Sequence, residues 1–194
     1  MIKAIRNSNV QCRCGQVKLT IDSPSALRFV CYSKDCRGYY QSLNEIARAN
    51  GQTEAAILDP WGGVDFTQIY PSEIVFEEGK EIAKTVLIRP DSPIRRVYSS
   101  CCYTPLFDIG QNSAMLNTHL LLNDDLKPDV RFRIIGRHSL PQSQDQQQPK
   151  PSISWSVPFS WLIVMGGRIK KQKMEPMPID VSKQPEIMKN FHQG

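Results

Sequence analysis

Apolar and polar residues follow a strand period in two early segments of the chain and a helical period in the next. Val17–Ile21 alternates, and Leu27–Cys31 is an apolar segment that ends on a cysteine, so both are predicted to be β-strands. Tyr39–Asn50 carries apolar residues three and four positions apart. Gly51 follows as a stop signal, so this segment is predicted to be a short helix.

Short β-like segments fill the middle of the chain. They are separated by prolines, glycines and charged turns, and they are Val64–Tyr70, Glu73–Phe76, Ile82–Ile88 and Ile94–Tyr98. Two further apolar segments follow at Ala114–Leu122 and Val130–Ile135. This order of elements predicts a mainly β fold, with antiparallel sheets and one short early helix.

The last part of the chain differs in composition from the β region. Ser139–Ser152 is rich in Gln, Pro and Ser and is predicted to be a flexible loop. Pro158–Lys173 is predicted to be a C-terminal helix, which the Gly166-Gly167 pair weakens. We therefore expect a β domain at residues 1–138, a loop at 139–152, and a helical appendage with a tail at 153–194.

Composition and charge narrow the class of protein. The chain has 194 residues, of which 40% are hydrophobic and 22% charged, as in ordinary globular domains. Its net charge of +5 is mild and its cations are mostly scattered, so we expect no nucleic-acid partner. The N-terminus has no apolar core of a secretory signal, and the longest apolar run, Trp161–Met165, is too short to cross a bilayer. We expect a soluble, cytoplasmic protein.

Six cysteines form three pairs along the chain: Cys12-x-Cys14, Cys31-x4-Cys36 and Cys101-Cys102. Structural disulfides rarely persist in the cytosol, so clustered thiols there favour metal ligation or reactivity. Zinc takes four tetrahedral ligands and binds thiolates well, and Gly15 allows a tight bend after the first pair. Zinc is therefore the favoured interpretation. Buried cysteines acting as small hydrophobes, and a disulfide, stay open as alternatives.

Several motifs in their order resemble one known family. They are Cys12-Arg-Cys14-Gly15, Cys31…Cys36-Arg37, Ile74-Val75-Phe76…Gly79 and Arg96-Val-Tyr98…Cys102-Tyr-Thr-Pro-Leu106. Together they resemble the glutathione-dependent formaldehyde-activating enzyme and centromere protein V family, over about Cys12 to Gly110. The resemblance implies a β-tent, in which antiparallel sheets surround a zinc site, with a second, open zinc. It also implies carbon–sulfur lyase chemistry on thiol adducts of small carbonyls, such as glutathione adducts.

The chain departs from the family's pattern for the structural zinc. Cys12, Cys14 and Cys102 fall on ligand positions, but Ser99 stands where the family has the fourth cysteine, and Tyr103 stands where it has a glycine. A serine hydroxyl is a poor zinc ligand because it does not ionise near neutral pH. Cys101 is the nearest thiol that could replace it, although Cys101 could equally face the core.

The second cluster departs further, because Ser33 stands at its middle cysteine position. Cys31 and Cys36 are then the candidate catalytic residues and form a possible weak second zinc site, to which His119 or His138 could contribute. We expect that second zinc to be weak or absent. Without it, the two thiols would be free and could form a redox pair. Arg13, Lys34 and Arg37 could attract an acidic thiol substrate, although a solvated surface role is the simpler interpretation.

The C-terminal segment offers a different interaction. Its apolar residues, which could line one helix face, are Trp155, Phe159, Trp161, Leu162, Met165 and Ile169, and its cations are Arg168, Lys170, Lys171 and Lys173. Such a helix either docks on the domain core or binds an acidic membrane surface or protein partner through residues 155–173. The favoured interpretation is docking on the core. Three functional classes follow for the protein: a lyase-type enzyme, a non-catalytic zinc-stabilised binding module, and a thiol redox protein.

Overall fold

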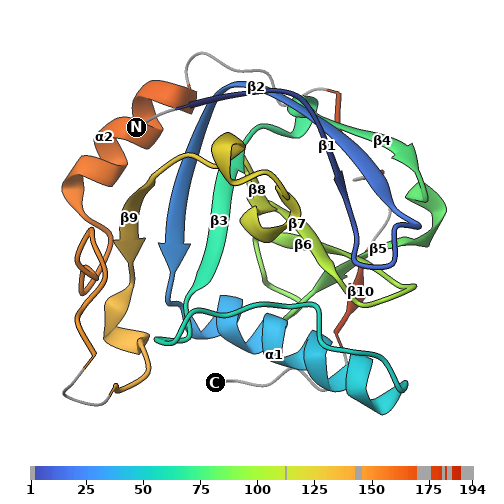
Figure 1. The fold of residues 1–194 in the computed structure, drawn as a ribbon, viewed down its shortest axis with the longest axis horizontal. Helices are drawn as coiled ribbons and strands as arrows, with labels where there is room; N and C mark the ends of the chain where they lie inside the picture. The colour runs from blue at the N-terminus through green and yellow to red at the C-terminus, as the bar shows by residue number, and fades with distance from the viewer. Residues whose placement is uncertain are drawn as a thin grey trace.

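The computed structural model describes residues 3–111, 113–142, 146–169, 176–180, 182 and 185–188. Its fold is mainly β, with one large mixed sheet and two helices (Figure 1). The strands are β1 (Lys3–Gln11), β2 (Lys18–Cys31), β3 (Val64–Ile69), β4 (Ile74–Glu78), β5 (Ala83–Leu87), β6 (Arg95–Ser99), β7 (Pro105–Ile109), β8 (Ala114–Asn117), β9 (Val130–Ile134) and β10 (Glu186–Ile187). The helices are α1 (Lys34–Ala49) and α2 (Phe159–Ile169). Short 3-10 turns connect several strands.

The long strand β2 joins two halves of the sheet. Its first part pairs with β4 through Lys18–Ile21, and its last part pairs with β3 through Leu27–Cys31. Pro24 lies between these two parts. A proline has no N–H for a sheet ladder, so it is tolerated where the strand changes partners. The two strands predicted at Val17–Ile21 and Leu27–Cys31 are therefore one continuous strand.

The sheet is mixed, whereas the sequence predicted antiparallel sheets. The order is β1-β2-β3-β8-β7-β6-β5-β10, and β4 and β9 also pair with β2. Most pairs are antiparallel, but β9 runs parallel to β2 and β10 runs parallel to β5. A parallel pair needs a long connection, which the chain from β2 to β9 supplies.

Three strands were not predicted: β1, β7 and the two-residue β10 in the C-terminal tail. β1 has a mostly exposed, polar face, and only three of its nine residues are buried. β7 is buried along its whole length, so it does not alternate. β1 and β7 lack the period-2 pattern by which strands were predicted, and β10 is too short to show one.

Helix α1 begins at Lys34 instead of Tyr39. The side chain of Ser33 accepts a hydrogen bond from the backbone N–H of Cys36, which caps the helix and starts it five residues early. The C-terminal helix predicted at Pro158–Lys173 is present over Phe159–Ile169 and contains Gly166 and Gly167; residues 170–173 lie outside the described residues. Among the described residues, neither helix combines the length and the apolar run that crossing a bilayer requires.

Two hydrophobic clusters form the interior. One lies between β1, β2 and the β6–β8 strands and includes Cys12 and Cys102. The other lies between the sheet, α1 and α2 and includes Cys31 and Cys36. The three predicted cysteine pairs are thus divided between two separate parts of the core.

Residues beyond 138 contact the β domain. Leu140 N–H donates to the carbonyl of Trp61, Ser154 N–H donates to Arg133, and Met188 N–H donates to Leu87. Part of the predicted loop at 139–152 is described and contains no helix or strand. The boundaries expected at 138 and 152 stay predictions.

Candidate metal centre

Cys12 and Cys14 lie in the turn that connects β1 and β2. Cys12 N–H donates to the carbonyl of Val17 at 3.0 Å, and Gly15 N–H donates to the carbonyl of Cys12 at 2.9 Å. Gly15 has a φ of +78°, a conformation that glycine adopts without strain. The tight turn predicted from the Cys-x-Cys-Gly spacing is therefore present, and it directs both thiols to one side.

Cys101 and Cys102 lie in the turn between β6 and β7. Ser99 N–H donates to the carbonyl of Thr104, and Tyr103 N–H donates to the carbonyl of Ser99, so the chain reverses within six residues. Tyr103 has a φ of +54°, in the left-handed region, at the position where the resembled family has glycine. This turn removes the usual objection to adjacent cysteines, whose side chains point to opposite faces on an extended strand.

The two turns bring four thiols into one group. The Sγ atoms of Cys12, Cys14, Cys101 and Cys102 all lie within 4.8 Å of one another. Cys12 Sγ lies 3.5 Å from Cys14 Sγ and 3.8 Å from Cys101 Sγ. Cys101 Sγ lies 3.2 Å from Cys14 Sγ and 3.9 Å from Cys102 Sγ. This group could hold a metal ion.

The geometry fits a tetrahedral ion bound by thiolates. A zinc–sulfur distance of about 2.3 Å places the sulfur atoms of a regular tetrahedron about 3.8 Å apart. Four of the six separations, 3.2 to 3.9 Å, lie close to that value, and the other two are within 4.8 Å. Cys101, whose role the sequence left open, is thus part of the group and does not face away from it.

Hydrogen bonds around Cys102 favour its thiolate. The hydroxyls of Ser99 and Thr104 lie 3.3 Å and 3.0 Å from Cys102 Sγ. Hydrogen bonds from Cys12, and then from these hydroxyls, lower the pKa of Cys102, while the same Cys12–Cys102 contact raises the pKa of Cys12. Ser99 therefore contacts a candidate ligand instead of acting as one. Burial and the contact with Cys14 raise the pKa of Cys101.

Cys31 and Cys36 lie in the other core cluster, at the junction of β2 and α1. Both are nearly buried, at 6% and 7% exposure. Cys31 donates to the hydroxyl of Ser33 at 3.4 Å, and a contact with Cys36 raises the pKa of Cys31. Ser33, at the position of the missing third cysteine, serves as the helix cap. No third metal ligand joins this pair among the described residues.

Arg96 and Asp108 form a charged pair beside Cys36, which the sequence reasoning did not identify. Arg96 Nη1 donates to Asp108 at 2.6 Å, and Arg96 Nη2 donates to Cys36 Sγ at 3.8 Å. Contacts with Cys31 and with Arg96 lower the pKa of Cys36, and burial raises the pKa of Asp108 to about 7. A sequence signal was present, because Asp108 interrupts the apolar segment Pro105–Ile109.

The two candidate histidines lie elsewhere. His119 follows β8 and lines a hollow of about 280 Å³ together with Cys12 and Arg13, next to the four-cysteine group. His138 lies in a 3-10 turn after β9, and its carbonyl accepts a hydrogen bond from Arg37 at 2.6 Å. Neither histidine joins Cys31 and Cys36 in a group of three or more metal ligands within the described ranges.

The three candidate cations also differ from one another. Arg37 is buried and bound to His138, so the surface role expected for Arg37 is wrong. Arg13 donates to the carbonyls of Thr53 and Glu54 and remains at the edge of the hollow beside Cys12. Lys34 is exposed at the start of α1, as expected.

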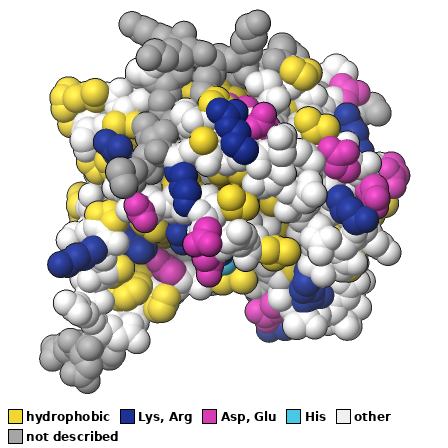
Figure 2. Space-filling model, turned by 45° about the horizontal axis from the view of Figure 1, so that its top comes forward, with side chains coloured by type: hydrophobic (Ala, Val, Ile, Leu, Met, Phe, Trp, Pro, Cys, Tyr) yellow, Lys and Arg dark blue, Asp and Glu magenta, His cyan; other side chains and the backbone are white. Residues whose placement is uncertain are grey.

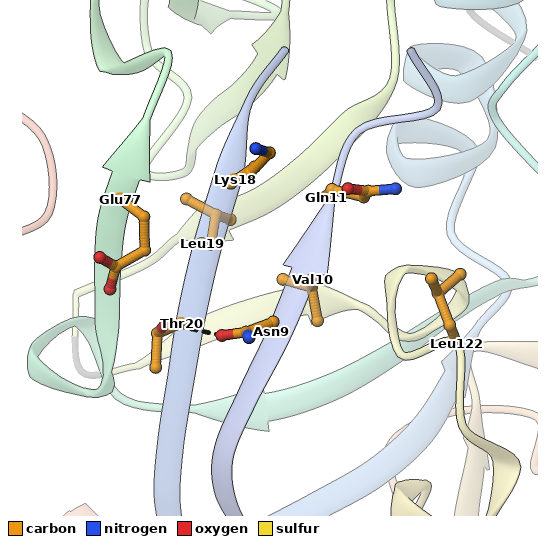
Figure 3. Close-up of a pocket in the computed structure, with 8 residues that line it drawn as sticks. All are labelled: Asn9, Val10, Gln11, Lys18, Leu19, Thr20, Glu77 and Leu122. Carbon is orange, nitrogen blue, oxygen red and sulfur yellow. Dashed lines mark hydrogen bonds between the residues drawn. The ribbon is translucent and has the colours of Figure 1, made fainter. Parts of the chain in front are cut away.

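A larger hollow, of about 560 Å³, lies on the outer face of β1 and β2 (Figure 3). Its lining residues are Asn9, Val10, Gln11, Lys18, Leu19, Thr20, Glu77 and Leu122. Figure 3 shows most of these side chains along β1 and β2, with Glu77 on β4, Leu122 on the loop that follows β8, and one hydrogen bond from Thr20 to Asn9. Because this lining contains no thiol and no histidine, the cysteine group is the stronger candidate for a functional site.

Comparison with known proteins places the chain in a family without assigning an activity. The model of a family of unknown function, DUF6151, matches residues 4–122. That range contains all six cysteines and ends before α2. No curated protein matches the chain. The chain therefore belongs to DUF6151, a family of unknown function.

Proposed function

We propose that this protein is a zinc-stabilised module of the β-tent type, in which one zinc ion binds Cys12, Cys14, Cys101 and Cys102. The observation that carries the proposal is the separation of 3.2 to 3.9 Å between neighbouring Sγ atoms of this group. Thiolates suit zinc best among the common cytosolic metals. The resemblance to the formaldehyde-activating family supports the same ion, since three of these residues match its structural zinc ligands.

The ion would act as a cross-link within the fold. The turn after β1 and the turn after β6 meet at this group, although Cys12 and Cys101 are 89 residues apart. A site with four protein ligands has no open position for a substrate, which is the usual arrangement of structural zinc. The ion would therefore stabilise the fold and would not take part in a reaction.

The lyase-type activity is the less favoured class. A catalytic zinc usually keeps three protein ligands and one open position. At the corresponding cluster, Ser33 caps α1 and leaves two thiols, Cys31 and Cys36, in the protein interior. A role in binding a thiol or a thiol adduct is still a prediction, and the hollow between Arg13 and His119 is the place to look for it.

Metal content per chain tests the proposal. We expect purified protein to contain one zinc per chain by inductively coupled plasma mass spectrometry. The Cys31→Ser/Cys36→Ser double variant is expected to keep that ion, because its thiols belong to the other core cluster. Protein without zinc would contradict the proposal. Two ions in the wild type and one in the double variant would instead favour the lyase-type enzyme.

Thiol redox chemistry at Cys31 and Cys36 is a second candidate function. The observation in its favour is the guanidinium of Arg96, which donates to Cys36 Sγ and stabilises a thiolate there. Cys36 also lies in the first turn of α1, where the helix dipole favours a negative charge. A thiolate stabilised in this way reacts with a peroxide that can reach it, and Cys36 is 7% exposed.

Hydrogen peroxide is the oxidant for this test. The Cys36 thiolate attacks one peroxide oxygen and hydroxide leaves; the Cys31 thiol then displaces water from the sulfenic acid. One S–S bond forms, the two thiols lose two hydrogens, and the peroxide becomes two waters. We expect peptide mass spectrometry to find a Cys31–Cys36 disulfide, with its yield reduced in the Arg96→Met variant. A sulfonic acid at Cys36 without a disulfide would contradict a redox pair.

A further inference from the structure

Helix α2 is attached to the domain by one side. Figure 1 shows it beside β9, at the outer edge of the sheet. Trp161 packs edge-on against Phe29 and Phe132, with ring centroids 4.6 Å and 5.3 Å apart. Val164 and Met165 pack against the same core cluster. The predicted docking of this helix on the core therefore accounts for one side of it.

The opposite side of α2 is apolar and uncovered. Phe159, Leu162 and Ile163 are 75%, 56% and 60% exposed and occupy helical positions i, i+3 and i+4. Trp155, just before the helix, is 74% exposed. Figure 2 shows hydrophobic side chains at the left edge of the molecule, on the side where Figure 1 has α2. A helix that is apolar all round is normally buried, so this side is expected to have a covering partner.

Two glycines extend the uncovered side. Gly166 and Gly167 continue it at positions i+7 and i+8, and a Cβ atom on either would meet nothing within 4 Å. The fold itself therefore has no steric need for glycine there, although glycine weakens a helix by about 1 kcal/mol. Because glycine has no side chain, the helix surface stays flat at these positions, which suits a partner with a broad, flat surface.

The net charge of the chain is concentrated, along the sequence, in the segment that contains α2. Residues 146–174 contain five cations and no carboxylate, and this equals the net charge of +5 for the whole chain. The cations are Lys150, Arg168, Lys170, Lys171 and Lys173. Acidic and basic residues elsewhere in the chain balance. The partner of this segment should therefore be anionic as well as apolar.

We infer that the uncovered side of α2 docks on an anionic lipid bilayer, with the helix lying in the interface. Aromatic and aliphatic residues beside a run of lysines form the usual pattern of such a helix. A second copy of the chain is a poorer occupant, because it would bring a second set of five cations to the same place. The surface lies outside residues 4–122, the range that matches the family. This inference does not depend on the zinc proposal.

Vesicle co-sedimentation of the full-length protein tests the inference. We expect binding to phosphatidylserine-containing vesicles to exceed binding to phosphatidylcholine vesicles by at least about tenfold, and to weaken in roughly 0.5 M salt. The bound fraction of the Leu162→Gln/Ile163→Gln variant should be at least about fivefold lower than that of the wild type. The reason is that the wild-type Leu162 and Ile163 side chains would enter the boundary between headgroups and acyl chains. Both residues are exposed in the free protein, so the substitutions should leave folding intact.

Val75→Gln is the matched control, since Val75 is an exposed aliphatic residue on β4, at 52% exposure. This variant should bind vesicles as the wild type does. Equal pelleting of wild type and the α2 variant would overturn the inference, as would the absence of wild-type binding. A dimer by size-exclusion chromatography that only the α2 variant loses would overturn it too, because a second copy would then be the occupant.

Discussion

Replacing Cys101 with serine is expected to lower the zinc affinity of the protein by at least about a hundredfold, because one of four thiolate ligands is lost. The stability of the fold should fall with it, since zinc bound only by the folded state adds its binding free energy to folding. Competition with a chromophoric chelator measures the affinity, and thermal unfolding with and without zinc measures the stability.

A compensating substitution makes this prediction sharper. Ser99 stands where the resembled family has a cysteine, and its hydroxyl lies 3.3 Å from Cys102 Sγ. A thiol at this position would point into the same group. The Ser99→Cys/Cys101→Ser variant is therefore expected to recover most of the lost affinity, with the fourth ligand moved by two residues.

The control for this pair of variants is Cys31→Ser, which removes a thiol from the other core cluster. Its zinc affinity should equal that of the wild type. If Cys101→Ser binds zinc as tightly as the wild type, then Cys101 is not a ligand and the four-cysteine site is wrong. If Cys101→Ser loses zinc affinity and the Ser99→Cys/Cys101→Ser variant does not recover it, then Cys101 is a ligand and a cysteine at position 99 cannot replace it.

Replacing Asp108 with leucine is expected to destabilise the protein by about 3–5 kcal/mol, because it leaves the Arg96 guanidinium buried without its carboxylate. The side chains of Arg96 and Asp108 are 1% and 3% exposed, so water cannot replace the lost partner. Arg96 also lies over the ring of Tyr39, at 4.9 Å from the centroid, and this contact does not neutralise the charge. Urea unfolding followed by circular dichroism measures the change.

Removing both charges should cost less than removing one. The Arg96→Met/Asp108→Leu variant is expected to recover most of the lost stability, since apolar residues of similar size can replace a buried ion pair. Asp65→Leu provides the comparison, because its partner Arg28 is 23% exposed and can be hydrated. Equal losses of stability in Asp108→Leu and Asp65→Leu would show that burial of the ion pair does not determine the cost of removing its carboxylate.

The outcome for Arg96 also bears on the redox candidate. Arg96 contacts both Asp108 and Cys36, so the single variant Asp108→Leu leaves Cys36 as the remaining acceptor of its charge. Removing Asp108 also removes a negative charge that disfavours a thiolate at Cys36. We therefore expect Cys36 to be alkylated faster at neutral pH in this variant. Reaction rates with iodoacetamide in Asp108→Leu and wild type compare the two.

Local pattern was sufficient for much of the fold. Alternation in Val130–Ile135 predicted a strand that the structure contains, because one face of β9 is buried. The short apolar segment Val64–Tyr70 was also predicted correctly as a strand, although β3 is buried on both faces. The Cys-x-Cys-Gly spacing predicted the turn after β1, since only glycine takes its φ without strain. Periodicity likewise identified both helices, and the cap at Ser33 extended the first of them.

The tertiary structure decided what no local pattern contains. The buried strand β7 and the mostly exposed β1 show no clean alternation, and the parallel pairing of β9 with β2 depends on segments about one hundred residues apart. The pair of Arg96 and Asp108 became visible only when β6 and β7 were placed side by side. The sequence by itself identified the cysteine pairs as candidate ligands and favoured zinc as the metal. Whether Cys101 joined the group depended on the turn between β6 and β7, because backbone dihedrals, and not residue order, direct adjacent thiols to the same point.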